Sequence, residues 1–232
     1  MKSEQKNELK ILYIQPEESF GKPAFYVSFI RISNYLNARR DEFKSNLEEE
    51  YLDLRFEKLP LYSPKTLKEY RGRLRSLLNQ TFKKFKFNVV AISCYTSYNY
   101  LYTVEVAMLI KHHVNPDSII VVGGVHPTMC PDDFDSDEIP DYFHDYYPKH
   151  STPFDFLVRD EGEIPFYRLM KRFSEGTVKR RKGLGKPPIK LQAECIHELD
   201  QIPIINLDLF KKYKNVLNKY GNVYLEWNRG CI

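Results

Sequence analysis

The feature that most constrains the fold of this chain is a short apolar run followed at once by two glycines. Residues Ile119 to Val122 are all β-branched, too few to form a helix, and apolar on both faces of a strand. A strand of this kind suits the middle of a parallel sheet, with helices above and below it. Gly123 and Gly124 then allow a sharp turn or a close approach of the backbone to a ligand. In an open α/β sheet ligands lie beyond the carboxyl ends of the strands, although a plain tight turn explains the glycines equally well.

Similar patterns along the chain predict an alternation of strands and helices. We expect strands at residues 10–14, 50–56, 88–93, 119–122 and 155–158, with the second of these near a sheet edge because its residues alternate in polarity. Apolar residues at helical spacing predict helices from about Pro23, from Ser63 with Pro64 in the first turn, between residues 97 and 113, and after residue 163. Strands joined by crossovers predict an α/β fold, a doubly wound, flavodoxin-like (Rossmann-like) five-stranded parallel sheet in the order 2-1-3-4-5.

Three regions depart from this alternation. Residues 132–153 mix acidic and aromatic side chains, which is typical of a surface insertion, or of a lid or docking surface. Residues 177–192 are basic and rich in glycine and proline, and they predict a hairpin or linker. Residues 222–227 read as one last strand without a partner in the main sheet. We therefore expect an α/β domain at 1–175, a hairpin and linker at 176–221, and the start of another domain at 222–232.

Charge, apolar runs and cysteine spacing argue against several classes of protein. The net charge of +4 comes from 35 basic and 31 acidic residues, so nucleic acid is not an expected partner. The first ten residues are polar and no apolar run has the length of a membrane span, so we expect a cytoplasmic protein with no membrane association. Cys94, Cys130, Cys195 and Cys231 have no CxxC spacing, and reduced thiols are the expectation.

Four segments, in this order, resemble one family. They are SCYTSYN at 93–99, VVGGVHPT at 121–128, VRDEGE at 158–163, and ELDQIP at 198–203 followed by a strand that ends in RGC. Together they resemble the cobalamin-binding-domain radical S-adenosylmethionine proteins over nearly the whole chain. The resemblance implies a flavodoxin-like cobalamin-binding domain at 1–175 and, after the linker, a partial barrel whose first strand leads into a CxxxCxxC motif.

The resemblance implies an iron–sulfur role for Cys231. In this family it would be the first of three thiolates on a 4Fe-4S cluster, whose open iron binds S-adenosylmethionine. Only Ile232 follows Cys231, so the enzyme assignment is uncertain: this polypeptide is expected to be a fragment that is not catalytic by itself. An ordinary thiol is the alternative for Cys231. The expected partners are the radical S-adenosylmethionine domain of the parent protein and a small-molecule or peptide substrate, and a homodimer stays open.

The resemblance also implies cobalamin contacts from loops at the carboxyl edge of the sheet. Glycines would lie against the corrin ring or its nucleotide tail, and hydroxyl groups would hydrogen-bond its amides and phosphate. The implied residues are Gln15, Pro16, Ser93, Tyr95, Thr96, Gly123, Gly124, His126, Pro127, Thr128, Glu161, Gly162 and Glu163.

Two departures from the family pattern qualify this site. No DxHxxG motif is present, so cobalt would not be held by a histidine after the first strand. His126 can either approach the ligand or organise its own loop through hydrogen bonds. Asp160 stands where the family more often has glycine.

The sequence leaves two alternative functions for this chain. The first is the cobalamin-binding domain of a radical S-adenosylmethionine enzyme that performs methyl transfer or a radical rearrangement. The second is a non-catalytic scaffold or interaction domain of the same fold with a degenerate, cofactor-free site. A signalling receiver lacks its acidic cluster here, and a dinucleotide-binding domain lacks GxGxxG after the first strand.

Overall fold

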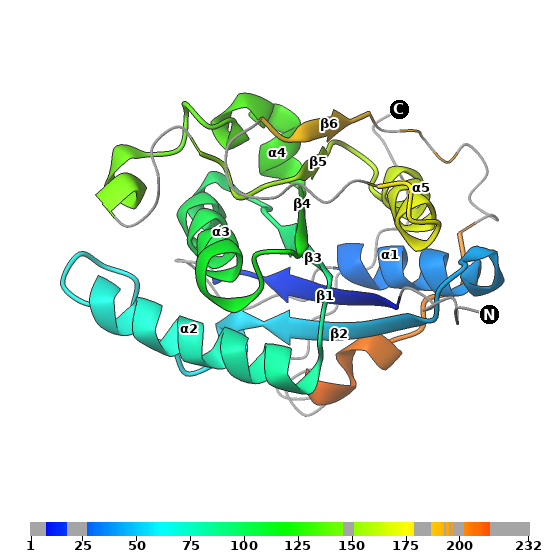
Figure 1. The fold of residues 1–232 in the computed structure, drawn as a ribbon, viewed down its shortest axis with the longest axis horizontal. Coiled ribbons are helices and arrows are strands. Elements are labelled where there is room, and N and C mark those ends of the chain that lie inside the picture. Colours follow the sequence, from blue (N-terminus) through cyan, green and yellow to red (C-terminus); the bar gives the residue numbers. More distant parts are fainter. Residues whose placement is uncertain are drawn as a thin grey trace, which may run out of the picture.

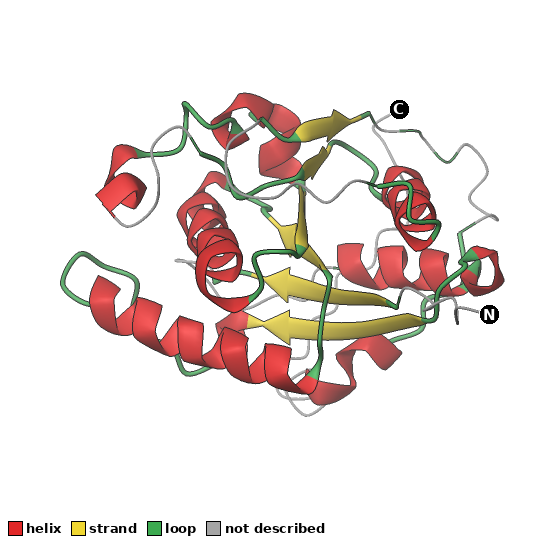
Figure 2. Cartoon of the chain, viewed as in Figure 1, coloured by secondary structure: helices red, strands yellow, loops and turns green. Residues whose placement is uncertain are grey.

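In the computed structural model the chain forms a six-stranded, entirely parallel sheet with helices on both faces (Figures 1 and 2). The structure describes residues 8–17, 27–145, 151–178, 187–192, 194, 196 and 202–213. The strands are β1 (Leu9–Gln15), β2 (Leu47–Asp53), β3 (Val89–Ser93), β4 (Ile119–Gly123), β5 (Phe156–Val158) and β6 (Ile189–Leu191). The α-helices are α1 (Ser28–Asn37), α2 (Leu67–Lys84), α3 (Ser97–Leu109), α4 (Val125–Met129) and α5 (Glu163–Ser174).

The strand order is β2-β1-β3-β4-β5-β6, which confirms the expected doubly wound fold and adds a sixth strand. β4 lies inside the sheet between β3 and β5, as its apolar run predicts. β6 pairs in parallel with β5, so the expectation of a hairpin or linker is wrong for Ile189 to Leu191. A tripeptide this short and exposed carries little strand signal in the sequence, and the free edge of β5 supplies its hydrogen bonds.

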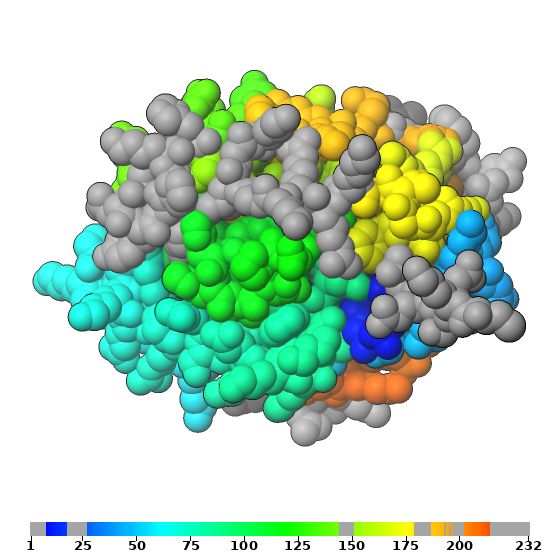
Figure 3. Space-filling model, in the orientation of Figure 1, coloured from blue at the N-terminus to red at the C-terminus, as the bar shows by residue number. Residues whose placement is uncertain are grey.

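Successive side chains along each strand point to opposite faces of the sheet, and they enter two separate hydrophobic cores. On one face, Leu12, Val90 and Ile120 pack with α2 and α3. On the other, Ile11, Ala91 and Val121 pack with α1 and α5. Side chains of α2, α3 and α5 form much of the surface in the view of Figure 3. This three-layer arrangement leaves the carboxyl edge of the sheet as the place where loops meet.

Two predicted elements differ in their bounds. α2 starts at Leu67 with Thr66 as its N-cap residue, so the expected helix start at Ser63 and Pro64 is wrong. The Ser63 hydroxyl instead lies 2.7 Å from the Thr66 hydroxyl, and the two groups hold a turn before the helix. Pro23, where the first helix was expected to begin, lies outside the described residues.

The second strand ends earlier than the expected range of 50–56. β2 stops at Asp53, whose carboxylate accepts hydrogen bonds from the Arg55 backbone N–H at 3.2 Å and its Nε at 2.8 Å. These bonds favour a 3₁₀ turn at Leu54–Phe56 over further strand. β2 does lie at a sheet edge, as predicted.

The acidic, aromatic segment after β4 is not only a surface insertion. Phe134 and Phe143 are fully buried and belong to the core on the α2 and α3 face. The segment contains 3₁₀ helices at Pro131–Phe134 and Asp141–Asp145, which place these rings inward while neighbouring acids such as Asp132 point to solvent. Phe134 and Phe143 therefore extend the core, and Asp132 lies outside it.

Within the described residues, no helix has both the length and the apolar character needed to cross a bilayer.

Candidate functional site

The carboxyl ends of β1, β3, β4 and β5 bring the loops with the predicted site residues to one edge of the sheet. The loops after β3 and β4 are joined through their backbones. The Cys94 N–H donates to the Gly123 carbonyl at 2.8 Å, and the His126 N–H donates to the Cys94 carbonyl at 3.1 Å. Asn99 connects a third loop, because its Nδ2 donates to the Glu17 carbonyl at 2.8 Å. The edge is therefore a hydrogen-bonded unit.

Gly124 is required for the contact between the loops after β3 and β4. Its φ of +120° is a conformation that side-chain-bearing residues rarely adopt. A Cβ placed there would lie 2.6 Å from the Cys94 carbonyl oxygen. The second glycine of the GG pair thus lets one loop lie directly on the other.

Asp160 also has a positive φ, of 54°. This is the left-handed region, which asparagine, aspartate and glycine tolerate best. Its backbone N–H donates to the Thr128 hydroxyl at 2.8 Å, and that hydroxyl donates to the Gly124 carbonyl at 2.9 Å. The left-handed backbone at this position tolerates aspartate and would also accept glycine.

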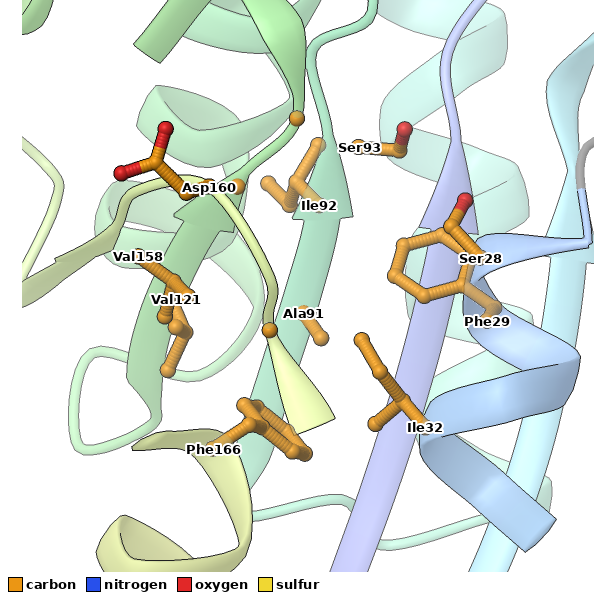
Figure 4. Close-up of a pocket in the computed structure, with 13 residues that line it drawn as sticks. Ser28, Phe29, Ile32, Ala91, Ile92, Ser93, Val121, Val158, Asp160 and Phe166 are labelled. Atoms are coloured by element: carbon orange, nitrogen blue, oxygen red, sulfur yellow. The ribbon is translucent and has the colours of Figure 1, made fainter. Parts of the chain in front are cut away.

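A cavity of about 100 Å³ opens at this edge, between β3, β4 and the helices α1 and α5 (Figure 4). Its apolar walls include Phe29 and Ile32 of α1 and Phe166 of α5, and Figure 4 shows Ile32 and Phe166 facing each other across one end. The Ser28 and Ser93 side chains supply hydroxyl groups to the lining. A Cβ on Gly162 would lie 3.3 Å from the Ile32 side chain, so the small size of Gly162 keeps this end open.

The structure brings some of the predicted residues to the cavity and not others. Ser93, Gly123, Gly124 and Gly162 line it. The lining residues that sequence reasoning did not assign to the site are Ser28, Phe29, Ile32, Ala91, Ile92, Val121, Val158, Asp160 and Phe166. Phe29 and Ile32 lie on the apolar stripe that predicts the first helix, but a stripe cannot show which of its residues border a cavity.

The remaining predicted residues lie on the same edge but outside the cavity lining. Gln15 is buried, and its Nε2 has no hydrogen-bond partner among the described residues. Pro16 is buried beside it, and Tyr95 is 42% exposed. Thr96 starts α3 by donating through its N–H to Asn99 Oδ1 at 3.0 Å. Pro127 is buried within α4.

The two predicted carboxylates after β5 have different surroundings. Glu161 accepts a hydrogen bond from the Ile196 N–H at 3.2 Å and so holds the later chain against this loop. Glu163 is buried in the first turn of α5. Cys231, the predicted cluster ligand, lies outside the described residues.

His126 does not line the cavity. Its ring is buried on the α3 side of the edge, where Nδ1 lies 3.1 Å from the Ser97 hydroxyl. Of the two roles that the sequence leaves open for this histidine, the observed contacts are those of a residue that organises its loop.

Burial shifts the ionisation of two groups near this edge. It raises the pKa of the Glu17 carboxyl to about 7, against a smaller lowering by the Tyr70 hydroxyl. It also raises the pKa of the Cys94 thiol to about 12, so this cysteine is protonated at neutral pH and is a poor nucleophile.

Large apolar side chains are exposed around the same loops. Tyr95 and Tyr98 follow β3, and Val125 and Met129 follow β4, with exposed fractions of 42%, 66%, 50% and 74%. Exposed apolar groups that gather at one edge are typical of a surface that contacts a ligand or another domain.

Comparisons with known proteins add one relative. The chain is 31% identical over 160 residues to an uncharacterized methyltransferase of Pyrococcus horikoshii. That match covers 64% of this chain and 30% of the relative, so the chain spans less than a third of the length of the curated protein it matches. No protein-family model matches the chain.

Among solved structures, the chain is similar to a Listeria monocytogenes protein provisionally described as UDP-N-acetylglucosamine 2-epimerase. The TM-score is 0.34 at 10% identity, with 70% of this chain and 41% of that chain covered. At this TM-score the likeness carries no functional information.

The cavity can be tested against the cobalamin that the sequence resemblance implies. Ligand pockets for drug-sized molecules usually measure about 300–1,000 Å³, so a cavity of about 100 Å³ takes only one end of such a ligand. Its apolar side chains and its glycine backbone leave space for a small apolar group. None of the described lining residues offers an imidazole to a metal. The cavity is therefore large enough for one end of a cobalamin at most.

Proposed function

We propose that this chain is the cofactor domain of a methyl-transfer protein and that the cofactor is a cobalamin. The observation that carries the proposal is the apolar, glycine-walled cavity at the carboxyl edge of a parallel sheet, the usual ligand position of such folds. The relative from Pyrococcus horikoshii supports methyl transfer as the broader role. A bound cobalamin would supply a cobalt centre that carries a methyl group.

The described residues would bind and position the cofactor. Phe29, Ile32 and Phe166 would bury one face of a planar tail, and the Ser28 and Ser93 hydroxyls would hydrogen-bond its polar atoms. Gly162 would allow the tail to enter, since a larger side chain meets Ile32. The exposed Tyr95, Tyr98 and Val125 would lie under the part of the ligand that the cavity cannot hold. A 4Fe-4S cluster with S-adenosylmethionine, through Cys231, remains part of the proposal for the parent protein.

The test compares cobalamin retention by two matched glycine variants. The purified chain is mixed with hydroxocobalamin, passed through gel filtration, and its visible spectrum recorded. We expect the wild-type chain to retain shifted corrinoid absorbance, and Gly162→Leu to lose at least tenfold in affinity because the leucine fills the cavity. Gly72→Leu is the control, because a Cβ at Gly72 of α2 meets no atom within 4 Å. Circular dichroism shows whether both variants keep the fold.

A specific observation also favours the scaffold alternative. The exposed apolar side chains after β3 and β4 would suit a protein partner as well as a ligand. If the folded wild-type chain retains no corrinoid, or Gly162→Leu binds as the wild type does, the cofactor proposal is wrong and the interaction role becomes the better one.

A further inference from the structure

Three potential metal ligands meet on the α3 side of the carboxyl edge. They are His126 in α4, Cys130 directly after it, and Asp133 in the following 3₁₀ helix. One ligand atom of each, the imidazole nitrogen, the thiol sulfur and a carboxylate oxygen, lies within 4.8 Å of the other two. These atoms are close enough for small side-chain movements to bring them around one ion.

The local backbone explains why these residues converge. His126 and Cys130 are four positions apart, and the Cys130 N–H donates to the His126 carbonyl at 2.8 Å, so their side chains lie on one face of the turn. Pro131 then begins a 3₁₀ helix that brings Asp133 back toward the histidine. The Tyr100 hydroxyl holds Asp133 in this position, because it donates a hydrogen bond to the Asp133 backbone carbonyl at 2.5 Å.

The imidazole of His126 is held in a fixed orientation, as in many metal sites. Its side chain is 6% exposed, and its Nδ1 lies 3.1 Å from the Ser97 hydroxyl. The ring packs against Tyr100 and Phe134, with centroid distances of 5.3 Å and 5.7 Å. Ser97 thus occupies one nitrogen and directs the other toward Cys130 and Asp133.

The second nitrogen of His126 is the observation that points to a ligand. Nε2 lies 3.0 Å from an Asp133 carboxylate oxygen, which is within ion-pair distance. Among the described residues this buried atom has no hydrogen-bond partner. An unsatisfied buried nitrogen in a protein usually has a reason, such as a missing ion.

We propose that His126 Nε2, Cys130 Sγ and an Asp133 carboxylate oxygen bind a divalent metal ion of the zinc class. A thiolate with an imidazole favours Zn²⁺ over Mg²⁺ or Ca²⁺, which prefer oxygen ligands alone. Because Cys130 is exposed, the fourth position of a tetrahedral ion opens to solvent and takes a water molecule. Three protein ligands and one water are typical of zinc sites that polarise or activate a bound molecule.

This site is formed by residues other than those that line the proposed cofactor cavity. The cavity lies between the sheet and the helices α1 and α5, whereas the His126 ring packs against Tyr100 of α3 and Phe134. None of the three ligands lines the cavity. Failure of cobalamin retention and failure of metal binding are therefore separate results.

Cobalt(II) is the probe for this site. The 232-residue chain is stripped with a chelator under reducing conditions and titrated with Co²⁺, followed by its visible and near-ultraviolet spectrum and by elemental analysis. We expect one Co²⁺ per chain, a thiolate-to-cobalt charge-transfer band, and displacement by Zn²⁺. Cys130→Ser should remove the band, and Asp133→Asn should weaken affinity at least tenfold.

Matched variants separate this site from others. Asp132→Asn is the control for Asp133→Asn, since the Asp132 carboxylate contacts Lys190, 2.5 Å away, and should bind Co²⁺ as the wild type does. Cys195→Ser combined with Cys231→Ser should keep the band. Ser97→Ala should weaken affinity about tenfold, the effect of losing a group that orients a ligand histidine. Circular dichroism confirms that each variant is folded.

Two results would overturn the proposal. One is a folded wild-type chain that binds neither Co²⁺ nor Zn²⁺ after reduction. The other is a charge-transfer band that persists in Cys130→Ser, or that disappears when Cys195 and Cys231 are replaced.

Discussion

At the scale of single residues, two backbone conformations hold the candidate site together. Gly124 has a φ of +120° and lies against the loop after β3. Asp160 has a φ of 54° and receives its support from the Thr128 hydroxyl. The first conformation is open almost only to glycine, whereas the second tolerates aspartate. The two positions should therefore respond differently to substitution.

We expect Gly124→Ala to lower the free energy of unfolding by about 1–3 kcal/mol, since the new Cβ meets the Cys94 carbonyl oxygen at 2.6 Å. Asp160→Gly should change stability by less than about 1 kcal/mol, because glycine also adopts the left-handed region. Urea titrations of both variants measure the difference. Equal effects at the two positions would show that the positive φ of Gly124 and its close contact do not limit stability.

At the scale of elements, a buried ion pair joins the two helices that cover one face of the sheet. Arg71 of α2 donates from Nε to Glu105 Oε1 of α3 at 2.6 Å and from Nη2 to Oε2 at 2.8 Å. The side chains are 9% and 0% exposed. A paired charge of this kind sets how two helices pack, but it adds little net stability because desolvation opposes it.

Removing one member of this pair should therefore be worse than removing both. We expect Arg71→Met to cost about 3–5 kcal/mol, because it leaves the Glu105 carboxylate buried without its main partner. Arg71→Met combined with Glu105→Gln should recover most of that loss. The free energies of unfolding of the two single variants and the double variant measure the coupling. A double variant as unstable as the sum of the single ones would contradict this account.

At the scale of the whole molecule, chain segments after α5 cover both edges of the sheet. β6 pairs with β5 at one edge. At the other, the 3₁₀ helix Asp208–Tyr213 packs against β2, where the Phe210 and Tyr51 ring centroids are 4.4 Å apart and Tyr213 Oη accepts from the Asp53 N–H at 2.9 Å. Residues that the sequence assigns to a linker therefore contact the α/β domain in two places.

This arrangement predicts that a chain ending at residue 178 is less stable than the full chain. Phe210 and Tyr213 are 1% and 3% exposed, and burying a large apolar side chain contributes about 1.5–3 kcal/mol. We expect a loss of at least about 3 kcal/mol in urea titrations, and self-association through the exposed edge of β5 in analytical ultracentrifugation. Equal stability of the two chains would support a domain boundary at residue 175. Phe210→Ala in the full chain is the control for the contribution of β2 packing alone.

The sequence by itself determined the layered architecture. β4 could be predicted from Ile119 to Val122, because a strand buried on both faces must be apolar throughout. The glycine pair could be placed at the carboxyl edge for the same reason: strand direction is fixed once parallel crossovers are inferred. These features depend on local composition and spacing, which a single sequence carries.

Only the tertiary structure decided which residues share the cavity, which way His126 faces, and where β6 pairs. Phe29, Gly162 and Phe166 come from separate elements, and their meeting depends on how α1 and α5 pack on the sheet. His126 joins Cys130 and Asp133 because Phe134 is drawn into the core on the α3 side. β6 forms because β5 offers a free edge, not because Ile189 to Leu191 favour a strand. The cavity and the β5–β6 pairing join residues far apart in sequence, so no local pattern encodes them. The direction of His126 depends on which core Phe134 enters, which the local sequence also does not show.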